Sequence, residues 1–475
     1  MKKTIKNLLY IIAILGLNAC DSSFLDVTPK QNIAIKDAIK DVNSLQSAVN
    51  GIYSQLQNDD YYGRTMILVP DLMPDNIYLS SSNSSSIFLN VNRFEVKVND
   101  SEVENAWNVM YSVAVNSTRA IKGAEAFMEA DEKTATEDAK QILGEAYTLR
   151  AMAHFDLLRL FAQPYNFTSN ASHAGVPLIT EVSDQPTYPS RNTVKEGYQL
   201  VVADLTKALS LLSEETGKGI ISINATKALL ARVYLYQEEW TEAAQMATEV
   251  IESGKYALYN AEDLPAKWDQ EFNDETIFEI INNITDHSGS NSLAHFFDPD
   301  GYAYGLATED LVNLYTDQDS RTDFFYLGDK GNEKDVYFVY KYSRNSPNKA
   351  VIQDENIKLI RFSELYLIRA EAYAELANDT KAQEDLQTIV QRAEPTAAPI
   401  TVTGQELKDR ILLERRKELA FEGHRLFDLT RKKKDVMINR GDDVLDIKYP
   451  NERFIFPIPL RELNTNPNLE QNPGY

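Results

Sequence analysis

The chain has 475 residues, a formal net charge of -23 and a single cysteine. No lysine- or arginine-rich stripe offsets the acidic excess, so a phosphate backbone would be repelled and nucleic acid is excluded as an expected partner. One cysteine also excludes an intrachain disulfide, so packing has to stabilise the fold.

Residues 1–20 have the pattern of an export signal. Three lysines precede residue 7, an apolar run covers 8–17, and Leu17-Asn18-Ala19-Cys20 follows. The run is about half the ~20 residues that a membrane-spanning helix needs. The pattern resembles a bacterial lipobox, which implies that 1–19 are a signal peptide and that Cys20 carries lipid. The alternative is an ordinary secretory signal that contains a cysteine. No second run of spanning length follows, so we expect membrane attachment through lipid alone.

Downstream, apolar residues at helical spacing predict a mainly α-helical fold. Helices are predicted over 41–57, 102–130, 137–161 and 193–212, and a pair over 224–253. Two stretches, 275–284 and 336–342, run or alternate apolar and predict short strands. We therefore expect a helical scaffold with a few short strands.

A helix-turn-helix pattern occurs twice, with every position displaced by 139 residues. The small and aromatic residues match the tetratricopeptide (TPR) pattern, in which small residues let two antiparallel helices approach closely. The matching residues are Ala231, Tyr234, Ala243, Ala247 and Val250, and then Ala370, Tyr373, Ala382, Leu386 and Ile389. Ala151 and His154 open a weaker third copy. Two generic amphipathic hairpins are the alternative.

Long irregular insertions interrupt this scaffold at 58–100 and 255–357. Loops of this length in a compact protein are usually functional. The serine-rich stretch 80–86 is too polar to pack and predicts a mobile surface loop. We therefore place the ligand contacts on the two insertions.

The candidate contacts combine aromatic rings with amides and carboxylates. An aromatic ring stacks on the apolar C–H face of a sugar, and polar groups bind its hydroxyls. The first insertion offers Asp75, Asn76, Tyr78, Asn83, Phe88, Asn90 and Asn92, and the second offers His295, Phe296, Phe297, Tyr302 and Tyr304. The alternative for each residue is ordinary loop packing.

The C-terminal third carries the most specific patterns. These are 360–373 (IRFSELYLIRAEAY), 413–429 (LERRKELAFEGHRLFDL) and the ending 456–475. They resemble SusD/RagB-type proteins, and 106–111 and 149–161 fit the same family. The resemblance covers nearly all of the mature chain, which we divide into an N-terminal helical region, 20–254, and a C-terminal region, 255–475.

The resemblance implies an outer-membrane lipoprotein that faces outward, with four TPR-like units and variable loops. It implies capture of oligosaccharides, or less commonly oligopeptides, for a SusC-like TonB-dependent transporter, without catalysis. Members that bind starch use tryptophans in loops, whereas Trp107 and Trp240 here lie in helical patterns. That difference disfavours a starch-like ligand. A TPR adaptor in envelope assembly and a lipid-anchored hydrolase are the alternatives from other classes.

The charged run 414–428 has two interpretations. Glu414, Glu418 and Glu422 are spaced to share one helix face, near His424, which would suit acid–base chemistry. Such residues also form ion pairs that fix a helix to its neighbours. Because the resemblance assigns this run to the scaffold, we expect the ion-pair network.

No cofactor or metal site is expected. The five histidines form no metal-binding pair at i, i+4, and no H-E-x-x-H pattern occurs. Asp298-Pro299-Asp300-Gly301 resembles the start of a calcium loop but lacks the further ligands. We predict a plain turn there.

Overall fold

The computed structural model describes residues 39–475 except Ser84, Ser86, Asp184, Glu215, 343–350 and 440–443. The predicted signal peptide and Cys20 lie outside the described residues. No helix in the described part of the chain is long and apolar enough to cross a membrane.

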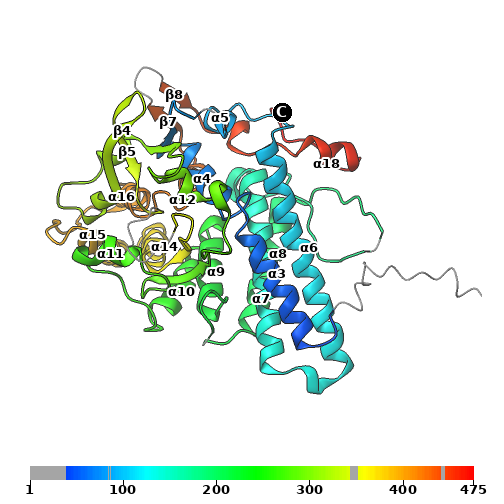
Figure 1. Cartoon of the computed structure of the whole chain (residues 1–475). Coiled ribbons are helices and arrows are strands. Elements are labelled where there is room, and N and C mark those ends of the chain that lie inside the picture. Colours follow the sequence, from blue (N-terminus) through cyan, green and yellow to red (C-terminus); the bar gives the residue numbers. More distant parts are fainter. Residues whose placement is uncertain are drawn as a thin grey trace, which may run out of the picture.

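Four long helices form one side of the molecule (Figure 1), and all four were predicted. They are α3 (Val42–Leu56), α6 (Ser101–Ala130), α7 (Glu137–Phe161) and α8 (Val194–Leu209). Oxygen-bearing side chains begin three of them: Asp41, Thr136 and Thr193 each accept a backbone N–H of the first turn. Where α8 crosses α7, a Cβ on Gly197 would lie 2.7 Å from Leu158, so the close approach requires glycine.

The two predicted TPR-like units are confirmed. They are α9 (Ile223–Gln237) with α10 (Trp240–Ile251), and α14 (Phe362–Glu375) with α15 (Asp379–Ala393). Even the turns correspond, because Glu238 and Ala377, 139 residues apart, both have positive φ, 63° and 57°. Although the units are distant in sequence, α10 packs against α14 (Figure 1). The weaker third copy differs, because α7 pairs with α8 only after a long connection, 162–193.

Most of the remaining α-helices are short. They are α4 (Thr65–Leu72), α5 (Leu89–Asn92), α11 (Leu264–Trp268), α12 (Leu293–Phe297), α13 (Glu309–Val312), α16 (Gly404–Glu418), α17 (Arg425–Arg431) and α18 (Leu460–Thr465). Helix α18 returns to the N-terminal half, where Leu460 N donates to Val98 O at 2.8 Å.

The described residues also form three antiparallel sheets. The largest has the order β1 (Ile77–Leu79), β3 (Gly305–Ala307), β5 (Glu333–Val339), β4 (Phe325–Lys330). The others pair β2 (Thr276–Ile280) with β6 (Ile357–Arg361), and β7 (Val436–Asn439) with β8 (Val444–Ile447). The predicted strands correspond to β2 and β5; the sequence pattern missed the other strands. Figure 1 shows β4, β5, β7, β8 and α5 at the upper end of the molecule.

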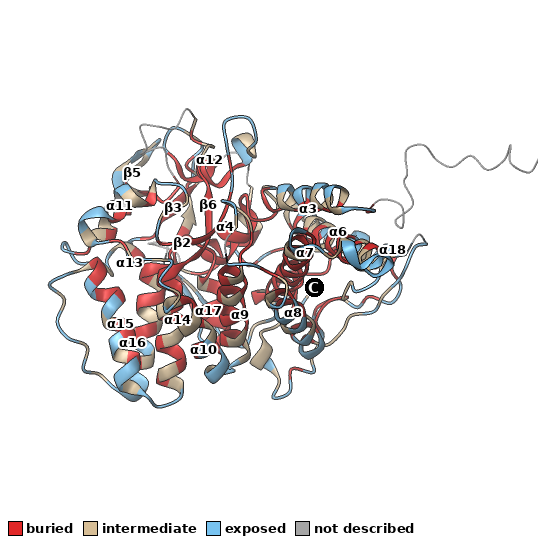
Figure 2. Ribbon diagram, turned by 90° about the horizontal axis from the view of Figure 1, so that it is seen from below, coloured by how far each residue is buried: buried red, intermediate tan, exposed pale blue. Residues whose placement is uncertain are grey.

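The main hydrophobic core includes residues from both sides of position 254, where we divided the chain. Helix α7 lies deep in this core, and every residue from Ile142 to Phe161 is buried (Figure 2). Buried polar residues on α7 have partners: Arg150 forms a bidentate ion pair with Asp204 at 2.7 and 2.8 Å. The sequence division at 254 therefore does not separate two independent cores.

Candidate ligand-binding face

The two predicted insertions meet at the four-stranded sheet. Strand β1 comes from the first insertion and β3 from the second, and Tyr78 pairs with Leu306. A hollow of about 550 Å³, here called the serine hollow, opens beside β1. Its lining residues are Tyr78, Leu79, Ser80, Ser81, Asn83, Leu89, Asn92, Arg93, Glu95 and Leu445. Three predicted contacts, Tyr78, Asn83 and Asn92, therefore line one hollow.

A second hollow of about 310 Å³, here called the acidic hollow, shares Tyr78 with the first. Its other lining residues are Ala307, Thr308, Glu309, Asp310, Lys334, Asp335, Val336, Tyr337 and Asn439. Burial, together with the nearby charges of Glu333 and Glu309, raises the pKa of Tyr78 to about 12. The phenol is therefore neutral at physiological pH and offers a hydroxyl to a ligand.

Stacked aromatic rings lie next to the serine hollow. The rings of Tyr302 and Tyr304 are 5.0 Å apart and 7° from parallel, and His295 meets Tyr302 edge-on at 4.4 Å. Tyr302 is 42% exposed, which leaves its ring available to a ligand. The main chain joins the two features, because Ser80 N donates to Tyr304 O at 2.8 Å. The structure thus brings the predicted residues His295, Tyr302 and Tyr304 together.

Several predicted contacts are buried, among them Phe297, which is 0% exposed. Phe88 and Phe296 are 2% and 3% exposed and pack edge-to-face, 6.1 Å apart. Phe296 also lies 6.1 Å from Tyr304, so it supports a surface ring from below. Asp75 and Asn76 are held by the C-terminal part of the chain. These residues support the face and do not form its surface.

The Asp75 carboxylate is bound by two guanidinium groups. Arg425 donates to both of its oxygens at 2.7 Å, and Arg416 lies 3.2 Å away. Although burial raises the pKa of Asp75, these two arginines hold it below its usual range. Asn76 accepts from Arg416 at 2.9 Å and donates to Asp71 at 2.6 Å. A largely buried carboxylate needs such cationic partners, so the side chain of Asp75 points toward Arg425 and Arg416 and not toward a ligand.

Two further loop predictions have different outcomes. The serine-rich stretch was expected to be a surface loop, and Ser81, Ser82 and Ser85 are exposed, whereas Ser80 is 2% exposed and donates to Glu333. Its position next to β1 explains the difference. The predicted turn at 298–301 is confirmed, because Gly301 N donates to Asp298 O at 2.9 Å.

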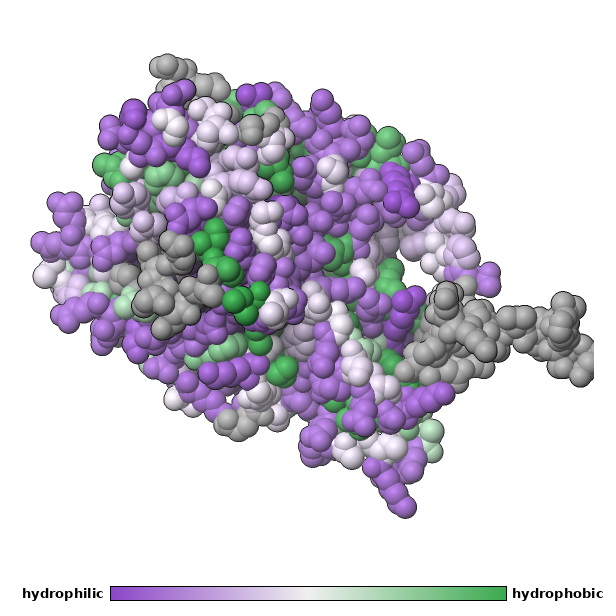
Figure 3. Space-filling model, viewed as in Figure 1, coloured by the Kyte–Doolittle hydropathy of each residue, from purple (hydrophilic) through white to green (hydrophobic). Residues whose placement is uncertain are grey.

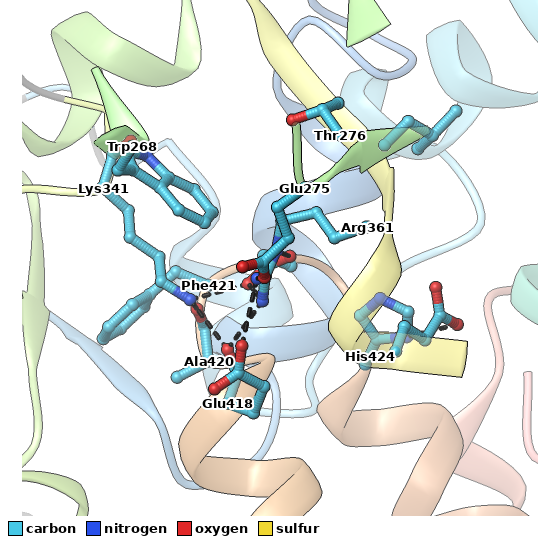
Figure 4. Close-up of polar contacts among 12 residues, drawn as sticks. Trp268, Glu275, Thr276, Lys341, Arg361, Glu418, Ala420, Phe421 and His424 are labelled. Atoms are coloured by element: carbon cyan, nitrogen blue, oxygen red, sulfur yellow. Dashed lines mark hydrogen bonds and ion pairs between the residues drawn. The ribbon is translucent and has the colours of Figure 1, made fainter. Parts of the chain in front are cut away.

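The charged run 414–428 forms the expected ion-pair network (Figure 4). Arg361, 1% exposed, lies between Glu275 at 2.6 Å and Glu418 at 3.0 Å. Lys341 donates to the backbone oxygens of Glu418 and Ala420, both at 3.0 Å. The charges therefore neutralise one another inside the protein and leave little freedom for acid–base chemistry.

One detail of the charged run was predicted incorrectly. Helix α16 ends at Glu418, and Phe421 follows with a positive φ of 68°. Glu422 therefore does not share a helix face with Glu414 and Glu418. It reaches Arg361 at 2.7 Å and Lys341 at 2.6 Å from a turn. The four-residue spacing could not reveal the break in the helix.

The same C-terminal motif fixes the base of β1. Arg416 donates to Asp75 O at 2.8 Å, and Thr308 Oγ1 donates to the same oxygen at 2.7 Å. Asp71 accepts the amides of Phe421 and Gly423 at 3.0 and 2.8 Å. Because β1 carries Tyr78, this bracing sets the position of the wall between the two hollows.

Three of the ten described non-glycine residues with positive φ lie at this face. Phe88, Ala303 and Asp335 have left-handed φ values of 58°, 45° and 55°. Non-glycine residues rarely adopt this conformation, and such residues cluster at ligand sites. Because others, such as Glu238 and Ala377, lie in turns between scaffold helices, these φ values do not single out the face.

Sequence reasoning missed several residues of the face. Tyr326 and Tyr340 stack 5.6 Å apart on and beside β4, and Tyr326 is 48% exposed. Tyr326 lies on β4, which was not predicted, whereas Tyr340 lies within the predicted strand 336–342, directly after β5. Outside this face, the surface shown in Figure 3 is mostly hydrophilic, and its hydrophobic residues are scattered in small groups.

Trp107, Trp268 and His154 are buried in the scaffold. Trp107 and Trp268 are 3% and 1% exposed, and Trp268 packs beside Lys341 in the network. His154 is buried between Arg150 O and Ile179 N, and burial lowers its pKa to about 4. No group of metal-binding side chains occurs among the residues that the structure describes.

Comparison with known proteins places this geometry in a family. The SusD family model matches residues 326–475, and a model described as "Starch-binding associating with outer membrane" matches residues 23–235. A SusD-like protein of Formosa agariphila is 25% identical, and the alignment covers 98% of each chain.

Solved structures agree with these matches. The crystal structure of a putative sugar-binding protein from Bacteroides vulgatus is 31% identical, with a TM-score of 0.84, over 92% of this chain and 99% of that one. A SusD superfamily protein from Bacteroides thetaiotaomicron is 28% identical, with a TM-score of 0.83, over 91% of this chain and all of that one. Because the matches extend from the first helices to the C-terminus, this chain belongs to the SusD family.

Proposed function

We propose that this protein captures oligosaccharides at the cell surface and delivers them to a SusC-like TonB-dependent transporter, without catalysing a reaction. The observation that carries the proposal is the stacked Tyr302–Tyr304 pair beside the serine hollow. Flat rings suit the C–H faces of sugars, and the serine and asparagine side chains of the hollow suit their hydroxyls. Relatives described as starch-binding and sugar-binding support the same ligand class.

Affinity would arise from a surface that is already in place. Phe296 supports Tyr304 from below, and the C-terminal motif braces β1 beneath Tyr78. A ligand that binds such a surface does not have to order it first, which lowers the entropic cost of binding. The scaffold therefore serves binding by holding the loops.

The ligand class is tested with a glycan array and calorimetry on the mature chain. We expect binding of oligosaccharides, and a loss of at least tenfold in affinity for Tyr78→Ala combined with Tyr304→Ala. Tyr188→Ala is the matched control, because Tyr188 is 49% exposed and does not line either hollow. Unchanged affinity in the double variant, with unchanged melting, would show that the site is elsewhere.

Other outcomes decide between functions. A peptide library that binds while every glycan fails would favour oligopeptide uptake. Cleaved glycan in the incubation would favour a hydrolase. Neither outcome is expected, because rings and hydroxyls dominate this face.

The anchor and the partner are tested in cells. We expect the wild-type protein in the outer-membrane fraction, sensitive to protease added outside, and Cys20→Ser released from the membrane. We also expect a TonB-dependent barrel to co-purify with the tagged wild-type protein. A membrane-bound Cys20→Ser variant would contradict lipid attachment at Cys20.

A further inference from the structure

A small cavity lies where the N-terminal helices meet the C-terminal part of the chain. Its volume is about 20 Å³, and it is here called the α7–α9 cavity. Its wall includes the end of α7, Tyr198 of α8, Tyr236 of α9, and Phe427 and Arg431 of α17. It shares no lining residue with the serine hollow or the acidic hollow, so it belongs to the scaffold and not to the ligand-binding face.

Three buried polar atoms on the lining residues lack a hydrogen-bond partner among the described residues. They are Nε of Arg159, the hydroxyl oxygen of Tyr236 and Oε1 of Gln163. Arg159 and Tyr236 are 9% and 5% exposed, and the guanidinium carbon of Arg159 lies 5.8 Å from the centre of the Tyr236 ring. Buried polar atoms in folded proteins almost always have a partner, because an unpaired one destabilises the fold. Three such atoms on residues around one cavity therefore indicate a bound molecule.

The surroundings of Gln163 and Tyr236 define what these two residues offer to that molecule. Gln163 Nε2 donates to Asn451 O at 3.0 Å, which orients the amide so that Oε1 is the unpaired acceptor. Burial raises the pKa of Tyr236, so its hydroxyl keeps its proton and can donate. The cavity thus offers one acceptor, just after α7, and one donor, on α9.

Arg159 supplies a second donor. Its guanidinium carbon lies 4.5 and 4.6 Å from the centres of the Phe155 and Phe427 rings, and these contacts hold the group in place. One of its terminal nitrogens donates to Asp156. The Nε–H group can only donate, and it remains for a molecule in the cavity.

Charge narrows the class of molecule that fits. The three guanidinium groups whose charges act on Tyr236 each have a carboxylate partner. The pairs are Arg159 with Asp156, Arg232 with Glu364 at 2.7 Å, and Arg431 with Asp428 at 2.7 Å. A cation would meet three arginines, and an anion would meet the unpaired oxygen of Gln163. The cavity therefore suits a small neutral molecule that can both accept and donate.

We propose that the α7–α9 cavity binds one ordered water molecule, which accepts hydrogen bonds from Arg159 Nε and the Tyr236 hydroxyl and donates one to Gln163 Oε1. A water molecule needs at least ~10–15 Å³ and typically makes about three hydrogen bonds to buried polar groups, which the volume and the three atoms match. A water-mediated bond is nearly as favourable as a direct one. The bound water links α7 to α9 and, through Gln163 and Asn451, to the C-terminal part of the chain.

The first experiment is a crystal structure of the mature chain at a resolution that shows ordered solvent, with a second crystal grown in sodium bromide. We expect one density peak within about 2.7–3.2 Å of Arg159 Nε, Tyr236 Oη and Gln163 Oε1, without anomalous signal from bromide. A cavity without density would overturn the proposal. An anomalous peak would also overturn it, because the site would then bind an anion.

The second experiment uses the sign of a stability change. If water is bound, Tyr236→Phe removes one of its hydrogen bonds, and we expect the unfolding equilibrium constant in urea to rise about three- to tenfold. If the hydroxyl has no partner, its removal should leave that constant unchanged or lower it, and this result would overturn the proposal.

Tyr234→Phe is the matched control. Tyr234 lies on the same helix, is half-buried and does not line the cavity. The control should change the unfolding equilibrium constant by less than about twofold. An equal rise in both variants would overturn the proposal, because the effect would then come from loss of a phenol on α9 and not from the cavity.

Discussion

The interior around Arg361 and the face around Tyr78 are both rich in polar residues, yet they differ in what those residues contact. Around Arg361, the carboxylates of Glu275, Glu418 and Glu422 are ion-paired within the protein. Around Tyr78, hydroxyls and rings line open hollows. The dense charge of 414–428 therefore indicates rigidity, and the uncommitted polar groups indicate binding.

The boundary between the two regions runs through a single short segment. Asp75 and Tyr78 lie three residues apart, but Asp75 is held by Arg425 and Tyr78 lines both hollows. Substitutions on the two sides of this boundary should therefore differ in their effects on stability and on binding.

Removal of the central cation should affect stability most. Arg361→Met would leave three carboxylates in the interior without their shared partner, and we expect the free energy of unfolding to fall by about 3–5 kcal/mol. Lys122→Met is the control, because Lys122 and Glu181 form a pair at 2.7 Å with side chains 38% and 76% exposed. That change should cost less than about 1 kcal/mol in urea unfolding. Similar losses in both variants would remove the distinction between interior and surface.

Substitution of Asp75 should separate positioning from contact. Asp75→Ala leaves Arg416 and Arg425 without their carboxylate, and we expect a loss of about 3 kcal/mol in stability with a parallel loss in affinity. Tyr78→Ala should cost about 1–2 kcal/mol in stability, because the side chain is half-buried, but at least tenfold in affinity. Thermal melting and calorimetry give both quantities. If Asp75→Ala weakened binding without loss of stability, Asp75 would be a ligand contact after all.

The pH dependence should distinguish buried carboxylates with and without cations. Burial by itself would raise the pKa of Glu418. The nearby charges of Arg392, Arg361 and Arg321 hold this pKa well below its usual range. Glu145 is buried beside neutral partners, Tyr53 and Gln141, at 3.0 and 2.9 Å, and burial raises its pKa to about 7.

Glu145 holds its proton more tightly in the folded protein than in the unfolded chain, and this sets how stability changes with pH. Between its unfolded pKa near 4.5 and its folded pKa near 7, the folded protein binds a proton that the unfolded chain releases. Stability from this group therefore rises as the pH falls through 7. From pH 8 to pH 5 we expect the wild type to gain about 2–3 kcal/mol relative to Glu145→Gln, measured by urea unfolding. The exposed Glu132→Gln is the control, and a gain of the opposite sign would refute the argument.

The smallest effect on stability is expected at the stacked pair. Tyr302→Ala removes a ring that is 42% exposed, so the free energy of unfolding should change by less than about 0.5 kcal/mol. Affinity for a bound oligosaccharide should fall about five- to tenfold with the loss of one stacking contact. Tyr188→Ala should leave it unchanged. Equal affinity in the two variants would remove Tyr302 from the proposed site.

Local patterns predicted the scaffold well. The spacing of apolar residues predicted α3, α6, α7 and α8, and the repeat of small residues predicted both TPR-like units. These features depend on contacts between residues close in the chain, which the sequence displays directly. The charged run was also interpreted correctly as a network, apart from the end of α16 at Glu418.

Composition alone could not assign the residues of the face. Asp75, Asn76, Phe88 and Phe296 have the same side chains as good ligand contacts, but Arg425 and the core hold them inside. Whether a polar or aromatic group is free depends on partners hundreds of residues away. Tyr326 was missed because the sequence pattern did not predict β4, although that strand pairs with β5, which follows it directly in the chain.

The order of residues thus established the class of the fold, its repeated helical units and the charged motif that fixes them. Folding in three dimensions established the β1-β3-β5-β4 sheet, the pairing of Tyr78 with Leu306 and the two hollows on either side of that tyrosine. The physical reason is range: helices follow from neighbours three or four positions apart, whereas a binding surface follows from which distant side chains meet and which remain without a partner.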